Sequence, residues 1–180
     1  MRRSPTLALL AAAVASAACS GPAPTKPSPA FYDITPAPAR SGETVLRGVS
    51  GTSGDEHFQL LGYTAGMPAT PGSHIEVPAV NGQYVRLHLL VTNTARTSAT
   101  LPLAAQRVET SDGTAYSPDL PTMSLKRQPL TPDLYAQSRL EFDLWYDIPA
   151  AAVPVKAVLQ GTTPYSTTPP PAVHLALPPA

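Results

Sequence analysis

Apolar and polar residues alternate along two stretches of this chain, which is the pattern of β-strands that bury one face. In the range Tyr84–Thr92, the apolar face consists of Val85, Leu87, Leu89 and Val91. In the range Arg139–Ile148, the apolar face consists of Leu140, Phe142, Leu144, Tyr146 and Ile148. The i, i+3, i+4 spacing of an amphipathic helix is not sustained anywhere between residues 41 and 161. The pattern therefore predicts an all-β fold.

Shorter apolar runs add further strands, and turn residues separate some of them. The weaker strand predictions are Val45–Val49, His57–Tyr63, Ile75–Val80, Leu101–Glu109 and Val153–Gln160. Asn81-Gly82 and Asp112-Gly113 are typical of tight turns, because both residue types tolerate positive φ. About seven strands with one apolar face each favour two sheets packed face to face. We expect an immunoglobulin-like β-sandwich over residues 41–161.

Proline is concentrated at the two ends of the chain. Ser20–Arg40 and Thr162–Ala180 hold six prolines each, 12 of the 23 in the sequence. Such segments favour extended polyproline II, so residues 19–40 are predicted to form a stalk that reaches roughly 65 Å. Within it, Phe31, Tyr32 and Ile34 either dock on the domain or form an apolar patch. The tail, residues 162–180, is predicted to be disordered apart from a possible edge strand at Val173–Leu177.

The first 18 residues have the features of a secretory signal. Arg2 and Arg3 precede the apolar run Leu7–Ala15, which is too short to span a bilayer. The small residues that follow lead to Cys19, the single cysteine of the chain. This arrangement resembles the lipobox of bacterial lipoproteins, which implies a diacylglyceryl anchor on Cys19 and a place on the extracytoplasmic face of the cell membrane. The alternative is a secreted protein whose cysteine is incidental.

Charge and cysteine content exclude several classes of protein. The sequence has 12 Lys and Arg against 12 Asp and Glu, and cleavage before Cys19 would leave a net charge of −2. A protein without a basic excess lacks the usual means of binding nucleic acid, which depends on phosphate contacts. One cysteine excludes an internal disulfide and a cysteine-based zinc site. The predicted sandwich must therefore rely on apolar burial.

The order of several short motifs is similar to a known family. The motifs are Val91-Thr92-Asn93, Leu101–Leu103, Asp112-Gly113, Tyr116, Leu130-Thr131-Pro132 and Ile148-Pro149. In this order they resemble the telokin-like, immunoglobulin-like domain found in bacterial lipoproteins and secreted antigens, over roughly Glu56 to Gly161. Asp133 stands where that family commonly has glycine. The resemblance implies an extracellular immunoglobulin-like fold and transfers no catalytic residues.

No motif indicates catalysis, a metal or another cofactor. His57, His74, His88 and His174 do not pair at metal-ligand spacing. Gly48–Thr52 resembles a nucleophile elbow but lacks the second glycine at the right place. Glu141, Asp143 and Asp147 could mimic a glycosidase pair, but alternating acids on one strand are typical of a polar outer face. We expect a protein that is not an enzyme.

Two features could support binding of a partner. Trp145 falls on the polar side of its strand, where it is either an exposed contact residue or is covered by another segment. Residues 114–137 form either a binding loop or a crossover between the sheets, and offer Tyr116, Met123, Lys126, Arg127 and Tyr135. The function we expect is a lipid-anchored surface domain that binds a protein or an envelope component. The alternatives are a structural spacer and, last, a hydrolase.

Overall fold

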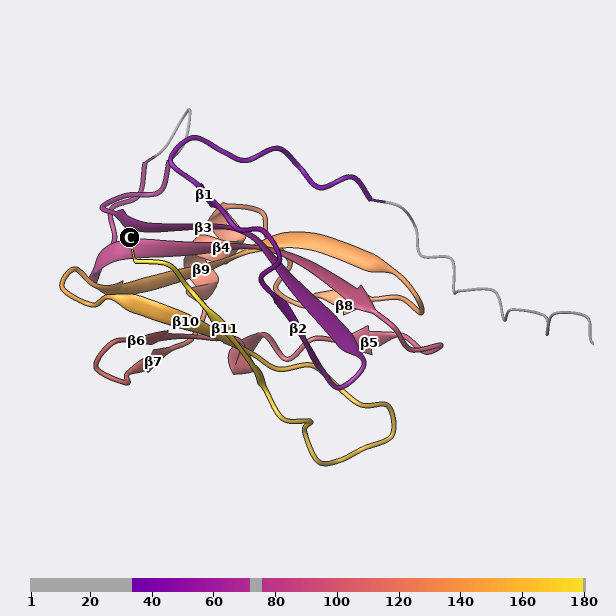
Figure 1. The fold of residues 1–180 in the computed structure, drawn as a ribbon. Coiled ribbons are helices and arrows are strands. Elements are labelled where there is room, and N and C mark those ends of the chain that lie inside the picture. The colour runs from indigo at the N-terminus through magenta and orange to yellow at the C-terminus, as the bar shows by residue number, and fades with distance from the viewer. Residues whose placement is uncertain (1–33, 72–75, 180) are drawn as a thin grey trace, which may run out of the picture.

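The computed structural model describes residues 34–71 and 76–179, so the predictions for Cys19, Phe31, Tyr32 and His74 lie outside the described residues. Within these two ranges, eleven strands and two short helices follow in chain order (Figure 1): β1 (Thr44–Val45), β2 (Ser50–Ser53), β3 (Glu56–Met67), β4 (Gly82–Asn93), β5 (Ala99–Thr100), a 3-10 helix (Leu103–Ala105), β6 (Arg107–Thr110), β7 (Ala115–Tyr116), α1 (Leu120–Leu125), β8 (Asp133–Leu134), β9 (Arg139–Pro149), β10 (Pro154–Leu159) and β11 (Val173–Ala176). The fold is an all-β sandwich, as the alternation predicted.

Two antiparallel sheets form the layers of the sandwich. The larger sheet has the order β1-β3-β4-β9, with β2 also paired to β3, and the smaller sheet has the order β11-β10-β6-β7. Figure 1 shows the long strands β3, β4 and β9 above β10, β11 and β6. A separate two-stranded sheet joins β5 to β8. The three long strands of the larger sheet therefore carry most of its surface.

The core lies between the two sheets and uses the predicted apolar faces. Leu87 on β4 and Leu144 on β9 are paired in the register and are both fully buried. Side chains of the smaller sheet, including Val108 and Leu159, belong to the same apolar cluster. Burial of these side chains stabilises the folded state by about 25 cal/mol for each Å² of apolar surface removed from water. This term holds the fold together, since a disulfide within the chain is excluded by its single cysteine.

The segment between β7 and β9 connects the smaller sheet to the larger one and covers the edge of β9. It contains α1, a helix that the sequence pattern did not predict because six residues are too few to show helical periodicity. Asp119 caps this helix by accepting a hydrogen bond from the Thr122 N–H at 2.9 Å. The Asp119 N–H donates to the Trp145 carbonyl, and the Asp143 N–H donates to the Gln128 side chain, each at 2.7 Å. The predicted crossover is therefore present and packed.

Two of the weaker strand predictions were wrong. Val45–Val49 is divided between the end of β1 and a bend before β2, and Gly48 there has a φ of 71°. Of the range Ile75–Val80, the described part is a single bridge between Pro78 and Ala69.

The run Leu101–Glu109 begins with a 3-10 helix and becomes strand at Arg107. Pro102 precedes that helix, and proline has no N–H to give to a strand ladder.

The C-terminal segment belongs to the sandwich. β11 pairs with β10 over Val173 to Ala176, so the possible edge strand at Val173–Leu177 is confirmed, while the disorder predicted for the rest of the tail is not found in residues 162–172. The chain between the two strands is fastened to β2 and β3, where the Ser53 hydroxyl donates to the Pro171 carbonyl at 2.8 Å. The folded part therefore extends well past Gly161. No helix among the described residues is long and apolar enough to cross a membrane.

Candidate functional site

The outer face of the larger sheet carries polar and charged side chains in the middle of its longest strands. The register places Arg86 opposite Trp145 and His88 opposite Asp143 across β4 and β9. All four side chains point away from the core, because the apolar residues of both strands occupy the alternate positions. An outer sheet face is normally solvated, yet these four residues are 5% exposed or less. Other parts of the chain must therefore cover them.

Residues 37–45, which we call the strap, cover part of this face. The Ala37 N–H donates to the Glu141 carboxylate at 3.0 Å, and Arg40 forms an ion pair with Asp143 at 2.7 Å. Glu43 follows, and β1 then pairs with β3. The last residues of the predicted stalk are therefore packed on the domain. The view in Figure 1 shows the strap running along the top of the larger sheet.

Glu43 is the most deeply buried charge of the strap, with 1% of its side chain exposed. Its carboxylate lies 3.1 Å from His88 Nδ1 and 3.7 Å from the Arg86 guanidinium, and it accepts a hydrogen bond from the Arg40 N–H at 2.7 Å. Gly62 of β3 leaves room for it, since a Cβ on that glycine would lie 2.0 Å from the Glu43 carboxylate. The missing side chain of Gly62 thus lets Glu43 reach the sheet.

His88 is enclosed between two carboxylates. Its Nε2 atom lies 2.7 Å from Glu141, while Nδ1 faces Glu43, and its side chain is 2% exposed. Both ring nitrogens are occupied by protein groups, so neither is available to a ligand. Among the described residues, no group of three or more His, Cys, Asp or Glu is arranged to hold a metal ion. The contacts of His88 with Glu43 and Glu141 thus attach the strap to the sheet.

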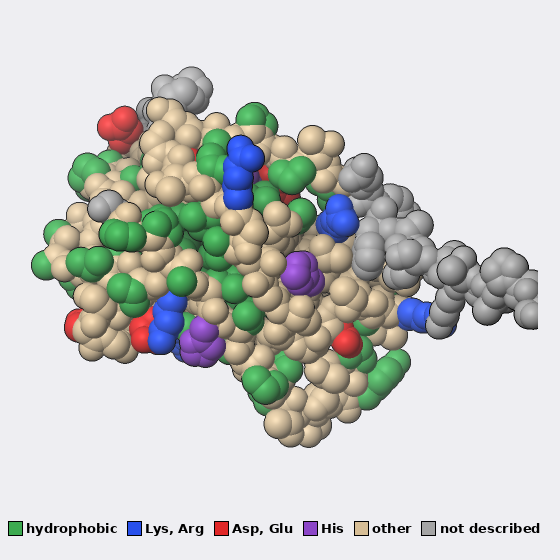
Figure 2. Space-filling view, viewed as in Figure 1, with side chains coloured by type: hydrophobic (Ala, Val, Ile, Leu, Met, Phe, Trp, Pro, Cys, Tyr) green, Lys and Arg blue, Asp and Glu red, His purple; other side chains and the backbone are tan. Residues whose placement is uncertain are grey.

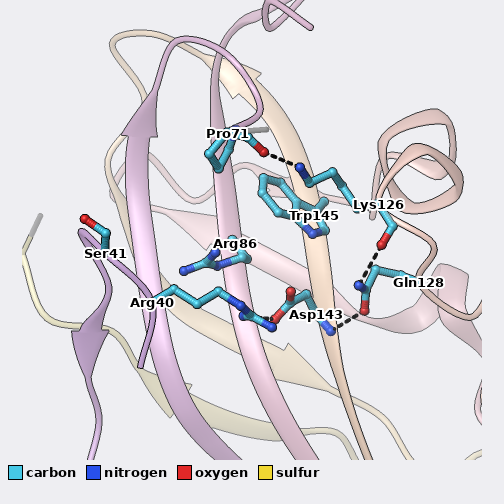
Figure 3. Close-up of a pocket in the computed structure, with 8 residues that line it drawn as sticks. All are labelled: Arg40, Ser41, Pro71, Arg86, Lys126, Gln128, Asp143 and Trp145. Atoms are coloured by element: carbon cyan, nitrogen blue, oxygen red, sulfur yellow. Dashed lines mark hydrogen bonds and ion pairs between the residues drawn. The ribbon is translucent and has the colours of Figure 1, made fainter. Parts of the chain in front are cut away.

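Beside the strap lies a pocket of about 470 Å³ above Trp145. Its lining residues come from five segments of the chain and are Arg40, Ser41, Pro71, Arg86, Lys126, Gln128, Asp143 and Trp145. Figure 3 shows Lys126 reaching over Trp145 from the side of the helix, while Arg40 and Asp143 meet at the opposite end. The volume falls in the range of about 300–1,000 Å³ typical of small-molecule sites. In the space-filling view of Figure 2, charged side chains are few and mostly well apart.

Cations surround the indole of Trp145. The Arg86 guanidinium carbon lies 5.7 Å from the ring centroid, and Lys126 Nζ lies 5.5 Å from it, both within the range of cation–π attraction. The Tyr84 ring packs against the indole edge to face, with centroids 6.2 Å apart. Burial lowers the pKa of Arg86, and the negative charges of Asp143 and Glu43 counter part of that shift. The guanidinium stays charged, because its ordinary pKa is so high.

Two nitrogen donors that belong to the pocket lining have no hydrogen-bond partner among the described residues. They are Arg86 Nε and Trp145 Nε1, and both atoms are buried. A buried donor without a partner costs roughly 1–3 kcal/mol relative to a satisfied one. Such groups are uncommon in folded proteins, and each one requires an explanation. Both atoms belong to residues that line the pocket, although the atoms themselves are enclosed by protein.

The structure brings together only part of the predicted binding set. Lys126 and Trp145 meet in the pocket, with Trp145 covered by other segments and 1% exposed, so the exposed-tryptophan interpretation was wrong. Met123 is fully buried in the core and cannot serve as a contact residue. Tyr116 lies half-buried on β7 of the other sheet, and Arg127 is exposed outside the pocket lining. Tyr135 is 73% exposed and lines a different groove, next to Ile34.

Sequence reasoning missed most residues of the pocket. Arg86 and Asp143 lie on the polar positions of the two strongest predicted strands. Side chains at such positions are expected to be exposed, so the sequence gives no sign that both are buried. Their proximity depends on the pairing of β4 with β9, and residues 57 positions apart cannot be paired from one sequence. Arg40 and Ser41 were assigned to the stalk and the domain boundary. Pro71 and Gln128 carry no local signal that points to a site.

The fold and the pocket together define the class of this protein as an all-β sandwich with a polar pocket on one sheet face. No protein-family model matches the chain, and no curated protein matches it significantly. Among solved structures it is similar to the yjhA protein of Bacillus subtilis, with 12% identity, a TM-score of 0.45 and coverage of 64% of this chain and 81% of that one. It is also similar to MPT63, a secreted protein of Mycobacterium tuberculosis, with 13% identity, a TM-score of 0.37 and coverage of 65% and 81%.

Proposed function

We propose that this chain is a lipid-anchored, extracytoplasmic binding domain of the cell envelope, and that the pocket above Trp145 is its binding site. The observation that carries the proposal is the pocket itself, in which three cations and a tryptophan line one cavity. Aromatic and arginine side chains are the residues most often found where binding energy is concentrated. The N-terminal pattern that ends at Cys19 supports the anchor.

Binding is favoured over catalysis by the surroundings of the titratable groups. A general acid or base must come within hydrogen-bond reach of a substrate. His88 is buried with both ring nitrogens engaged, and the Asp143 carboxylate in the pocket is held by Arg40. A hydrolase would need one of these groups to be released. We propose in addition that the domain belongs with the telokin-like, immunoglobulin-like domains of bacterial lipoproteins.

Blocking the pocket tests the binding function. The full mature chain with Cys19 replaced by serine is incubated with isolated cell-envelope fragments and sedimented, so that retention reports binding without the anchor. Ser41 lies exposed at the pocket, and Ser41→Phe is expected to reduce retention at least about tenfold by filling the cavity. Ser111→Phe places the same bulk in an exposed turn of the other sheet and should leave retention unchanged. Equal retention of both variants, or none for the parent chain, would favour the structural spacer.

The anchor makes its own prediction. In the producing cell, Cys19→Ser is expected to move the protein from the membrane fraction to the soluble extracytoplasmic fraction, because acylation requires the thiol. Ser20→Ala changes the neighbouring residue, keeps the cysteine and should stay with the membrane. The measurement is cell fractionation followed by detection of the protein. Membrane retention of the Cys19→Ser variant would contradict the lipid anchor.

A further inference from the structure

We propose that the ligand of this pocket is a small molecule held through a carboxylate or phosphate group. The inference rests on the proposed binding function and adds the chemical class of the ligand. Three cations line the pocket, namely Arg40, Arg86 and Lys126. The carboxylates near them are Asp143, paired with Arg40, and Glu43, 3.7 Å from Arg86. Each arginine has one of these carboxylates as a partner, which leaves the positive charge of Lys126 in excess among the charged residues of the lining.

Lys126 supplies that excess at an accessible position. Its ammonium group donates to the Pro71 carbonyl, which is a neutral partner, and lies over the face of Trp145. No ion pair with an acid is recorded for Lys126 among the described residues, in contrast to Lys156, which is 2.8 Å from Glu109. An ammonium ion with only a neutral acceptor keeps its full attraction for an anion. Lys126 is half-buried, so it can meet a ligand at the mouth of the pocket.

The hydrogen-bonding groups of the pocket also favour an acceptor-rich ligand. Arginine, lysine and tryptophan side chains donate and do not accept. The main acceptor of the lining, Asp143, is already bound by Arg40, whereas Lys126 has only a neutral acceptor. A cationic ligand would be repelled by the lining cations, and a neutral ligand would gain no attraction from the charge of Lys126. A carboxylate or phosphate offers oxygens to several donors at once, and guanidinium groups match that geometry.

The single tryptophan of the sequence allows a direct measurement, because its fluorescence reports only on this pocket. Three probes share one sugar ring and differ in charge: glucose, glucuronate and glucose 6-phosphate. Each is titrated into the full mature protein with Cys19 replaced by serine, in a buffer without phosphate. Glucuronate or glucose 6-phosphate is expected to change the emission and raise Tm, and glucose is not. The two anionic probes distinguish a carboxylate source from a phosphate source.

Matched lysine variants locate the effect. Lys126→Gln removes the charge at the pocket and is expected to weaken binding of the anionic probe at least about tenfold, as for loss of a charged hydrogen-bond donor. Lys156→Gln removes a lysine from the smaller sheet, away from the pocket, and should leave the affinity unchanged. Far-ultraviolet circular dichroism confirms that both variants are folded. Added salt should reduce binding, because screening weakens attraction between a cation and an anion.

The outcomes separate the ligand class from the binding function. Binding of the anionic probes that is lost in Lys126→Gln supports the proposal. Glucose binding as tightly as the anions, or anion binding that is unchanged in Lys126→Gln, overturns the ligand class. If neither anion changes the fluorescence while envelope fragments still retain the protein through the pocket, the ligand class fails and the binding function stands. If Ser41→Phe has no effect on retention either, the binding function fails as well.

Discussion

Replacing Glu43 by alanine is expected to lower the free energy of unfolding by about 3–5 kcal/mol, the usual cost of removing one partner from a buried ion pair. The variant removes the carboxylate nearest to the Arg86 guanidinium, and it leaves His88 Nδ1 without its carboxylate partner. It also opens a void above Gly62 and removes the acceptor of the Arg40 N–H. Because folded domains are stable by only about 5–15 kcal/mol, this loss is a large fraction of the total. Urea unfolding, followed by circular dichroism, measures it.

Two further variants show whether the effect comes from the buried charge. Glu43→Gln keeps the shape and an acceptor oxygen, and should cost less than the alanine variant if it folds. Glu109→Ala removes the partly exposed partner of Lys156, and surface pairs of this kind contribute about 0–1 kcal/mol. A loss for Glu43→Ala that is no larger than that of Glu109→Ala would show that the strap adds nothing to the stability of the sandwich.

The second large effect is expected at Gly161, where alanine should cost about 3 kcal/mol. A Cβ there would lie 2.1 Å from the Ser53 carbonyl oxygen and 2.4 Å from the Glu56 carboxylate. Neither group can retreat easily. The Gly161 N–H donates to the Ser53 hydroxyl at 2.9 Å, and fully buried Glu56 accepts from the N–H and the hydroxyl of Thr162 at 2.6 and 2.7 Å. Breaking these contacts would leave a carboxylate buried without partners.

Gly113 offers the matched control for this change. It lies in a turn with φ at 83°, and a Cβ there meets nothing within 4 Å. Gly113→Ala therefore carries only a backbone penalty, about 1 kcal/mol. Urea midpoints compare the two variants, and Gly161→Ala should have the much lower midpoint. Similar midpoints for the two would mean that the C-terminal segment is held loosely against β2 and β3.

The core could be predicted from the sequence because it depends on local alternation. Along β4 and β9 every second residue is apolar, and that parity alone assigns the inner face. The same reasoning failed for β1 and β2, where the strands are two and four residues long and little alternation is visible. The edge strand of the tail was predicted, but proline content predicted disorder for the rest of the tail, where Thr162 and Pro171 are fastened to β2 and β3.

The candidate site could be predicted only in part, since alternation assigns a residue to a sheet face but does not show what covers that face. Trp145 was placed correctly on the outer side of β9. It shares its pocket with Arg40 and Ser41 of the strap, with Pro71 and with Lys126, which come from three distant segments. Lys126 was selected because it lies in a long segment between strands, and it does meet Trp145. The combination of cations around the indole required the tertiary structure.

The strap has a mechanical consequence when the domain is considered as a tethered object. In chain order, Ala37, Arg40 and Glu43 form the polar contacts that bind the strap to the sheet. Tension on the chain ahead of Ala37 would load these contacts one after another, before it reached the ladder between β1 and β3. Arg40 is also a wall of the pocket. A force between the proposed anchor and a ligand bound in the proposed site would therefore act on the strap first, and detachment of Arg40 would open the site.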